Sequence, residues 1–275
     1  MRVDVSAYLL CYNNAQTILS AIDSVVRQSI DVQRIIVIDD GSDDGSRKAI
    51  KTTKAELFET GSNQGRGYAR ALAMEQLESE LVLCCDATID LAPDFLEKAL
   101  QELESDDDAA AVFGNLHQRE SANTADRWRE RHLFAPARVN ETRRVHSFHT
   151  TAALVRRSEF MEAGNYDKNL RHSEDAEIAK RVVKRGKHFL ASPLCRMYAN
   201  LSNPALKVLE RHWRWYAGEN EHYDAKTYAK RIGYSFKVMA RKDLKDGDWR
   251  SIILSLFSPH YQLYKALKGR ENATA

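Results

Sequence analysis

A short run of branched apolar residues leads directly into a pair of carboxylates near the start of the chain. Residues 35–38 are Ile-Ile-Val-Ile, and Asp39, Asp40 and the turn residue Gly41 follow at once. Branched residues without polar alternation are typical of a strand that is buried on both faces, as in a parallel sheet. Ligands of open parallel sheets bind where the strands end, so these carboxylates are predicted to meet a ligand. The alternative is an acidic turn that only caps the next helix.

The residues around this strand predict a β-α-β unit and further elements of both kinds. Residues 3–11 form a predicted first strand that ends in a polar turn, and apolar residues from Ile18 to Val26 recur at helical spacing. The same kinds of pattern predict strands at 81–86, 109–115 and 149–155 and helices at 94–103, 156–164, 173–186 and 206–216.

Composition indicates an enzyme-sized chain without a strong charge bias. The chain has 275 residues, of which 43% are hydrophobic and 29% charged, which suits one large α/β domain or two closely fused halves. The net charge of +2 gives no global preference for nucleic acid. Cys11, Cys84, Cys85 and Cys195 form no CxxC pair, so reduced core thiols in a cytoplasmic protein are expected. We also expect no signal peptide and no membrane span.

Six short motifs are spread across about residues 3–190. They are Cys11-Tyr12-Asn13-Asn14, Val37-Ile38-Asp39-Asp40-Gly41-Ser42, Asn63-Gln64-Gly65 with Ala69-Arg70, Cys85-Asp86-Ala87-Thr88, Gly164-Asn165-Tyr166-Asp167, and Ser173-Glu174-Asp175. These motifs resemble those of family 2 glycosyltransferases of the GT-A fold and occur in the family's order. The resemblance implies an α/β fold of the GT-A type, with a mostly parallel central sheet flanked by helices. It implies a glycosyltransferase domain at 1–200, with a nucleotide-binding half at about 1–100 and an acceptor half at 101–200, and a helical C-terminal extension at 201–275.

The resemblance also implies a nucleotide pocket at the ends of the first strands. Tyr12 is expected to offer its ring to the base, and Asp39 is expected to hydrogen-bond the base or the ribose. Further nucleotide contacts are expected from Asn13, Asp40, Asn63, Arg70 and Asp86. The alternative for Arg70 is a solvated helix residue. The expected donor is a nucleotide-diphospho sugar, with UDP favoured over GDP and dTDP.

Asp86 stands at the start of the family's Asp-x-Asp motif, which holds the sugar diphosphate through a divalent ion. Mn²⁺ or Mg²⁺ suits hard oxygen ligands and bridges phosphate oxygens. Thr88 replaces the second Asp of the motif, and a neutral hydroxyl is a poor substitute for a carboxylate. In an extended segment Asp90 would project to the same side as Asp86 and could complete the site. The alternative is an ion that is bound weakly or not at all.

The acidic pair Glu174-Asp175 resembles the family's catalytic pair. Asp175 would then be the general base that deprotonates an acceptor hydroxyl, and Glu174 would orient the acceptor or a neighbouring basic residue. One carboxylate suffices for an inverting transfer, because that reaction is a single displacement at the anomeric carbon. Acidic residues are also favoured at a helix start by the helix dipole, so a structural role is the alternative.

The C-terminal region supplies further basic and aromatic residues. Arg211 and Arg214 are candidates, together with Thr88, for contacts to the diphosphate or the acceptor, and His212 could complete the metal site. The apolar stretch at 251–267 could lie on the inner face of a membrane. Packing on the domain or at a homodimer interface is the favoured interpretation. Residues 116–146 are polar and without a clear period, which predicts a mobile segment or an excursion on the acceptor side.

Two functions of different class are consistent with these residues. The first is an inverting glycosyltransferase that moves a sugar from a nucleotide-diphospho sugar to a hydroxyl acceptor in cell-surface polysaccharide or glycolipid synthesis. The second is a non-catalytic nucleotide-sugar binder or structural partner in a polysaccharide assembly complex, for which the replacement at Thr88 argues. A dinucleotide-dependent dehydrogenase is disfavoured, because its glycine-rich loop follows the first strand, whereas Gly61, Gly65 and Gly67 come after about the third.

Overall fold

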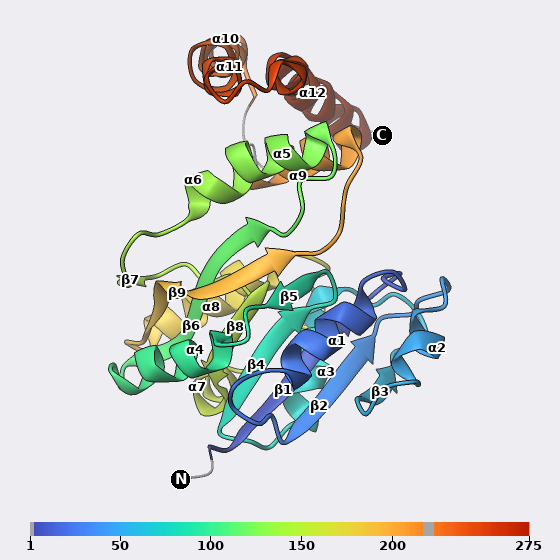
Figure 1. Ribbon diagram of the computed structural model, residues 1–275, viewed down its shortest axis with the longest axis vertical. Helices are drawn as coiled ribbons and strands as arrows, with labels where there is room; N and C mark the ends of the chain where they lie inside the picture. Colours follow the sequence, from blue (N-terminus) through green and yellow to red (C-terminus); the bar gives the residue numbers. More distant parts are fainter. Residues whose placement is uncertain (1–2, 217–222, 275) are drawn as a thin grey trace. The chain divides into compact units, whose positions relative to one another are not determined.

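The computed structural model describes residues 3–216 and 223–274, which divide into two compact units (Figure 1). Unit 1 comprises Met1–His117 and Arg138–Leu201, and unit 2 comprises Gln118–Ala137 and Ser202–Ala275. Unit 2 thus resumes close to the predicted boundary at residue 200, but it also takes up a segment from the middle of the predicted acceptor half. Residues 217–222 and 275 of the predicted extension lie outside the described part.

Unit 1 contains, in its described residues, a nine-stranded sheet in the order β3-β2-β1-β4-β8-β6-β9-β5, with β7 paired to β9. The pairs β1–β2, β1–β4 and β2–β3 are parallel, whereas β4–β8, β6–β8, β5–β9 and β7–β9 are antiparallel. The strands are β1 (Val5–Cys11), β2 (Arg34–Asp39), β3 (Glu56–Glu59), β4 (Leu81–Asp86), β5 (Ile89–Leu91), β6 (Ala109–Gln118), β7 (Arg143–Val145), β8 (Ala152–Arg156) and β9 (His188–Ala199). The helices of this unit are α1 (Ile18–Val26), α2 (Ser46–Ile50), α3 (Arg66–Gln76), α4 (Phe95–Glu104), α7 (Arg157–Glu162) and α8 (Glu174–Lys184).

The apolar runs that predicted strands are buried on both faces of this sheet. Tyr8, Ile36 and Cys84 belong to a core that includes residues of α3, α7 and α8. Their strand neighbours point to the opposite face, because side chains alternate along a strand. Leu9 and Val37 on that face are fully buried as well. The predicted α/β class is therefore confirmed, and the four cysteines are buried and free, as expected.

Unit 2 is helical in its described residues. It contains α5 (Thr124–Arg129), the π-helical segments η1 (Glu130–Phe134) and η2 (Ser235–Ala240), α6 (Ala135–Ala137), α9 (Ala205–Tyr216), α10 (Ala225–Tyr234), α11 (Arg241–Lys245) and α12 (Trp249–Thr274). None of the helices in 3–216 and 223–274 combines the length and the apolar character needed to cross a membrane.

The prediction of a mobile segment at 116–146 is wrong, because residues 124–137 are helical. Asn123 caps α5 by accepting a hydrogen bond from the backbone N–H of Asp126 at 2.8 Å, and Trp128 is fully buried. The helical period was hidden because the buried face also carries charges. Asp126 and Arg129 form an ion pair of 3.2 Å in which both side chains are almost wholly buried.

Candidate active site

The register of three neighbouring strands brings two carboxylates to one edge of the sheet. Asp39 of β2 pairs with Cys11 of β1, and Asp86 of β4 pairs with Leu10 on the other side of β1. The three strands are parallel, so their carboxyl ends lie at the same edge. Tyr12 follows β1 directly and is 47% exposed. These residues therefore surround the end of β1, at the edge where open α/β sheets bind ligands.

Asp39 is fully buried, yet only one of its carboxylate oxygens is hydrogen-bonded. Its Oδ1 accepts from the backbone N–H of Ser42 at 2.9 Å, and Arg47 Nε lies 3.8 Å from the same oxygen. Its Oδ2 is buried without a hydrogen-bond partner among the described residues. Leaving a buried acceptor unpaired costs about 1–3 kcal/mol. Oδ2 is therefore suited to receive a donor from a ligand, such as the ring N–H of a nucleotide base.

Asn13 fixes the turn that follows β1. Its backbone is left-handed, with φ at 53°. Its N–H donates to Ser42 Oγ at 2.9 Å, and its side-chain Oδ1 accepts from the N–H of Asp43 at 2.9 Å. These bonds tie the turn after β1 to the turn after β2, so Asn13 holds the two strand ends together.

Asp40 and Asn63 make hydrogen bonds that hold the loop that precedes α3. The Asp40 carboxylate accepts hydrogen bonds from the backbone N–H groups of Gln64 at 2.8 Å and Gly65 at 2.9 Å. Arg171 Nη1 donates to the Asn63 carbonyl at 3.1 Å, and Arg171 also contacts the Asn63 side chain. Direct nucleotide contacts of Asp40 and Asn63 stay predictions, since these bonds give both residues a structural role.

Arg70 of α3 joins residues from three separate segments. Its Nε donates to Glu174 Oε1 at 3.0 Å, its Nη2 to Asp86 Oδ1 at 2.9 Å and its Nη1 to the Tyr8 hydroxyl at 3.2 Å. Burial lowers the pKa of Arg70, but Tyr8, Asp86 and Glu174 raise it well above its ordinary value, so the guanidinium stays charged. Tyr8 was not predicted as a site residue, although a tyrosine inside an apolar strand indicates a buried hydroxyl that needs a partner.

The glycines before and within α3 allow close backbone packing, and they do not form a dinucleotide-binding loop. The N–H of Gly67 donates to the Leu170 carbonyl at 2.9 Å, and a Cβ at Gly67 would lie 2.1 Å from the Asp167 carbonyl oxygen. A side chain at this position would therefore collide with backbone. The N–H groups of Gly65 and Gly67 already donate to Asp40 and Leu170, so they are not available to cradle a phosphate.

Glu174 and Asp175 occupy the first turn of α8 but have different surroundings. Glu174 is 2% exposed, and its Oε2 is buried without a partner among the described residues. Asp175 is half-buried and accepts a hydrogen bond from the backbone N–H of Ala176 at 2.8 Å. Asp175 is thus the more exposed carboxylate of the pair, and Glu174 is the one bound to Arg70.

The extended course predicted from Asp86 to Asp90 is wrong, because Ala87 and Thr88 form a turn between β4 and β5. Asp90 is 2% exposed. Both of its oxygens lie 2.8 Å from the Ser20 hydroxyl, and its Oδ1 accepts from Asn200 Nδ2 at 2.6 Å. These contacts argue against Asp90 as a metal ligand. The role of Asp90 in metal binding stays a prediction.

The donor set around Asp86 does not form a complete divalent-cation site. Within the described residues, no group of three His, Cys, Asp or Glu side chains could hold a metal ion. Asp86 is partly accessible, with 27% of its side chain exposed, but one oxygen is taken by Arg70. Thr88 is half-buried, and its carbonyl accepts from the N–H of Asn200 at 3.1 Å.

The basic candidates from the C-terminal region lie on α9 in unit 2. His212 is buried there, and its Nδ1 lies 3.0 Å from both Ser258 Oγ and Gln262 Nε2. Burial, and then the neighbouring charges of His132 and Arg231, lower the pKa of His212 to about 3. His212 is therefore neutral. The expected contacts of Arg211, His212 and Arg214 with a diphosphate, acceptor or metal stay predictions.

Two solved structures of other proteins share this fold. The mannosyltransferase PcManGT from Pyrobaculum calidifontis, solved with GDP-Man and Mn²⁺, is 18% identical, with a TM-score of 0.57 over 100% of this chain and 76% of that chain. Residues 1–349 of Staphylococcus aureus TarS, solved with UDP, are 15% identical, with a TM-score of 0.58 over 99% of this chain and 91% of that chain. The predicted GT-A type fold is therefore confirmed.

Sequence comparison gives the family directly. A poly-β-1,6-N-acetyl-D-glucosamine synthase of Staphylococcus aureus is 21% identical over 226 residues, which cover 79% of this chain and 55% of the relative. The chain therefore spans about half the length of this curated relative. The model of the family described as glycosyl transferase family 2 matches residues 6–164, more than half of the chain. The chain belongs to glycosyl transferase family 2.

Proposed function

We propose that this protein is an inverting glycosyltransferase that moves a sugar from a nucleotide-diphospho sugar to a hydroxyl acceptor. The observation that carries the proposal is the buried, unpaired Oδ2 of Asp39, a residue that pairs in register with Cys11, the residue before the exposed Tyr12. A base seated against Tyr12 supplies the missing hydrogen-bond donor. The ribose and the diphosphate then extend along the sheet edge toward Asp86, the last residue of β4 on the other side of β1.

The acidic pair at the start of α8 supplies the chemistry in this proposal. Asp175 accepts the proton of the acceptor hydroxyl as its oxygen attacks the anomeric carbon, and the bond from that carbon to the nucleoside diphosphate breaks in the same displacement. Glu174 orients the neighbouring basic residue Arg70, whose Nε donates to the Glu174 carboxylate at 3.0 Å. The leaving diphosphate carries the developing negative charge.

UDP is the favoured nucleotide, with GDP and dTDP as alternatives, and a polysaccharide or glycolipid hydroxyl on the cytoplasmic side of a membrane is the favoured acceptor. The support is the likeness to a poly-β-1,6-N-acetyl-D-glucosamine synthase and to TarS with bound UDP. PcManGT was solved with Mn²⁺. If Mn²⁺ or Mg²⁺ takes part here, Asp86 is its protein ligand, and the diphosphate has to supply most of the remaining oxygens.

A titration of the whole protein with UDP, GDP and dTDP tests the nucleotide site. Isothermal calorimetry is run with Mn²⁺ and again with EDTA. The proposal expects saturable binding of at least one nucleoside diphosphate with one site per chain. No heat of binding from any of the three under either condition would contradict it.

The second candidate is a nucleotide-sugar-binding protein without turnover, and the replacement of the second motif carboxylate by Thr88 favours it. The two candidates differ in one measurement. A transferase releases nucleoside diphosphate from the donor that it binds, whereas a pure binder holds the donor unchanged. The Glu174-Asp175 pair favours the transferase, because a binder has no need of a base.

A further inference from the structure

Helix α12 of unit 2 buries small polar side chains and exposes large apolar ones. Its buried side is formed by Ser251, Ser255, Ser258 and Gln262, each at most 2% exposed. Its outer side carries side chains that are 47–64% exposed, namely Trp249, Ile253, Phe257, Tyr264 and Leu267. Within both sets the spacings are three, four or seven residues, which are helical repeats, so the two sets lie on opposite faces of the helix. A helix that faces only protein and water has the reverse distribution.

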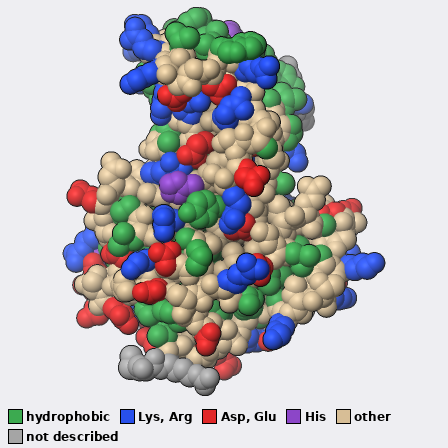
Figure 2. Space-filling model, viewed as in Figure 1, with side chains coloured by type: hydrophobic (Ala, Val, Ile, Leu, Met, Phe, Trp, Pro, Cys, Tyr) green, Lys and Arg blue, Asp and Glu red, His purple; other side chains and the backbone are tan. Residues whose placement is uncertain are grey.

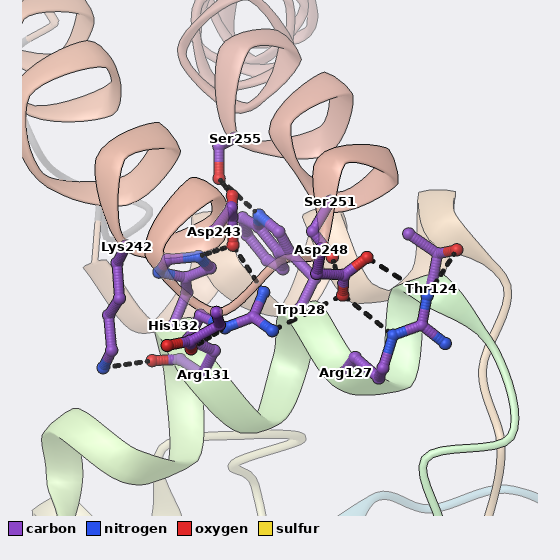
Figure 3. A network of polar contacts seen from close by, with 11 residues as sticks. Thr124, Arg127, Trp128, Arg131, His132, Lys242, Asp243, Asp248, Ser251 and Ser255 are labelled. Atoms are coloured by element: carbon purple, nitrogen blue, oxygen red, sulfur yellow. Dashed lines mark hydrogen bonds and ion pairs between the residues drawn. The ribbon is translucent and has the colours of Figure 1, made fainter.

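Hydrogen bonds fix which face of α12 turns inward (Figure 3). Ser255 Oγ donates to Asp243 Oδ2 at 2.5 Å and accepts from Trp128 Nε1 at 2.9 Å. Asp243 is fully buried and also binds Arg131 at 2.6 Å and His132 at 2.7 Å. The inner serines thus satisfy a buried polar network, and rotating the helix would leave these groups unpaired. The apolar outer face follows from this arrangement.

The neighbouring segment η2 shows the same inversion. Ser235 is buried, and its hydroxyl donates to the Ser255 carbonyl of α12 at 2.5 Å. Tyr234, Phe236 and Val238 around it are 44–61% exposed. Figure 2 shows hydrophobic side chains grouped over the helices of unit 2, with Lys and Arg side chains beside them. We call the exposed residues Trp249, Ile253, Phe257, Tyr264, Leu267, Tyr234, Phe236 and Val238 the outer apolar face.

The net charges of the two units have opposite signs. Unit 2 contains 18 Lys and Arg residues and 11 Asp and Glu residues, whereas unit 1 contains 23 Lys and Arg residues and 28 Asp and Glu residues. Exposed cations lie in the same elements as the outer apolar face or directly beside them, at Lys237, Arg241, Arg250 and Lys268. A second copy of unit 2 would meet this surface with the same positive charge and be repelled. The surface therefore complements a partner that carries negative charge.

We propose that the outer apolar face binds the surface of a membrane that contains anionic lipids. Exposed leucine, isoleucine and phenylalanine side chains enter the boundary between headgroups and acyl chains, and the surrounding Lys and Arg side chains contact lipid phosphates. Trp249, Tyr234 and Tyr264 suit this boundary, because their rings are apolar and their polar atoms stay with water. The inference goes beyond the proposed transfer reaction and does not depend on it.

Vesicle co-sedimentation tests this proposal with the whole protein. Vesicles of equal parts phosphatidylglycerol and phosphatidylcholine are compared with vesicles of phosphatidylcholine alone. Wild type is expected to bind the anionic vesicles and to lose affinity as salt is added. The double variant I253E/F257E is expected to bind about tenfold more weakly or worse, because it removes two exposed apolar side chains that would insert into the membrane and adds repulsion.

The matched control is V26E/L194E in unit 1. Val26 and Leu194 are 59% and 50% exposed, compared with 64% and 47% for Ile253 and Phe257, and the charge change is the same. Far-UV circular dichroism checks that both variants are folded. Fluorescence quenching adds a test that does not need the glutamate variants. Brominated lipid in the anionic vesicles should quench the tryptophan emission of wild type, and W249F should lose most of that quenching.

The proposal is wrong if wild type binds neither kind of vesicle, or if I253E/F257E binds as well as V26E/L194E. It is also wrong if sedimentation velocity shows a wild-type dimer that I253E/F257E dissociates, because the face then belongs to a second copy of the chain. Equal quenching in wild type and W249F would likewise overturn it.

Discussion

The guanidinium of Arg70 and the carboxylate of Glu174 form a buried ion pair of 3.0 Å, with only 1% and 2% of their side chains exposed. Arg70 binds Asp86 with its next nitrogen, at 2.9 Å. One side chain therefore links the end of strand β4 to the start of α8. Arg70 thereby holds Asp86, the last residue of β4, and Glu174 of the acidic pair proposed for catalysis in one arrangement.

Replacing Arg70 by Met should lower the free energy of unfolding by about 3–5 kcal/mol, because it leaves the buried Glu174 carboxylate unpaired. Urea unfolding followed by far-UV circular dichroism measures this loss. Arg66→Met is the matched control, since Arg66 lies in the same helix but is exposed. Equal stability of the two variants would show that the Arg70 pair contributes nothing to the fold.

Asp39→Asn should weaken the binding of the preferred nucleoside diphosphate by about 1–3 kcal/mol, the usual effect of losing a hydrogen bond to a charged partner. The amide keeps the shape of the side chain, and calorimetry measures the dissociation constant. Asp43→Asn serves as control, because Asp43 is exposed in the same turn. If both variants bind as tightly as wild type, the buried Asp39 oxygen does not face the nucleotide.

Thr88→Asp should strengthen nucleotide binding in Mn²⁺ but not in EDTA, because it restores a second carboxylate next to the strand end that carries Asp86. Thr88→Ser keeps the hydroxyl and should leave binding unchanged. Asp90→Asn should not alter the Mn²⁺ dependence, since Ser20 and Asn200 already contact the Asp90 carboxylate. Loss of the Mn²⁺ effect in Asp90→Asn would instead make Asp90 a ligand.

The strand ends were predictable because their signals are local. The run at 35–38 with Asp39, and the apolar strand ending in Asp86, need only the preference of branched residues for buried strands. The place of Asp90 was not predictable, because it depends on the turn at Ala87 and Thr88 and on the pairing of β5 with β9, which is more than 100 residues away in the chain. Pairings between distant segments leave no local pattern.

The helices at 124–137 were missed for a local reason, the charges on their buried face, whereas the contacts of Arg70 were missed because they are long-range. Residues 124–137 are helical although their buried face includes Asp126 and Arg129, and only their mutual ion pair makes that burial acceptable. Arg70 was expected to face the nucleotide. The structure pairs it with Glu174, which lies 104 residues further along the chain.

The pKa of His212 predicts how the stability of unit 2 depends on pH. Its pKa is about 3 in the folded protein and 6.5 for an ordinary histidine, so between these values the unfolded chain binds a proton that the folded chain does not. The free energy of unfolding should therefore fall as the pH drops from about 6.5, by up to about 1.4 kcal/mol per pH unit. All four tryptophans, Trp128, Trp213, Trp215 and Trp249, lie in unit 2, so their emission during urea unfolding reports on this unit.

His212→Gln should flatten this pH dependence between pH 4.5 and 6.5, because glutamine does not titrate. His260→Gln is the control, since His260 is exposed on α12. An unchanged slope in His212→Gln would mean that another group takes up the proton.

The most direct test of the proposed function is the turnover of Asp175→Asn. Release of nucleoside diphosphate from UDP-, GDP- and dTDP-linked sugars is measured for wild type, for Asp175→Asn and for Glu177→Gln, which changes a half-buried carboxylate in the same helix. We predict that wild type releases the diphosphate, that Asp175→Asn does so about 10²–10⁴-fold more slowly with nucleotide affinity unchanged, and that Glu177→Gln is close to wild type. Wild-type turnover in Asp175→Asn would contradict the role of Asp175, and a wild-type protein that binds nucleotide but releases no diphosphate would favour the non-catalytic alternative.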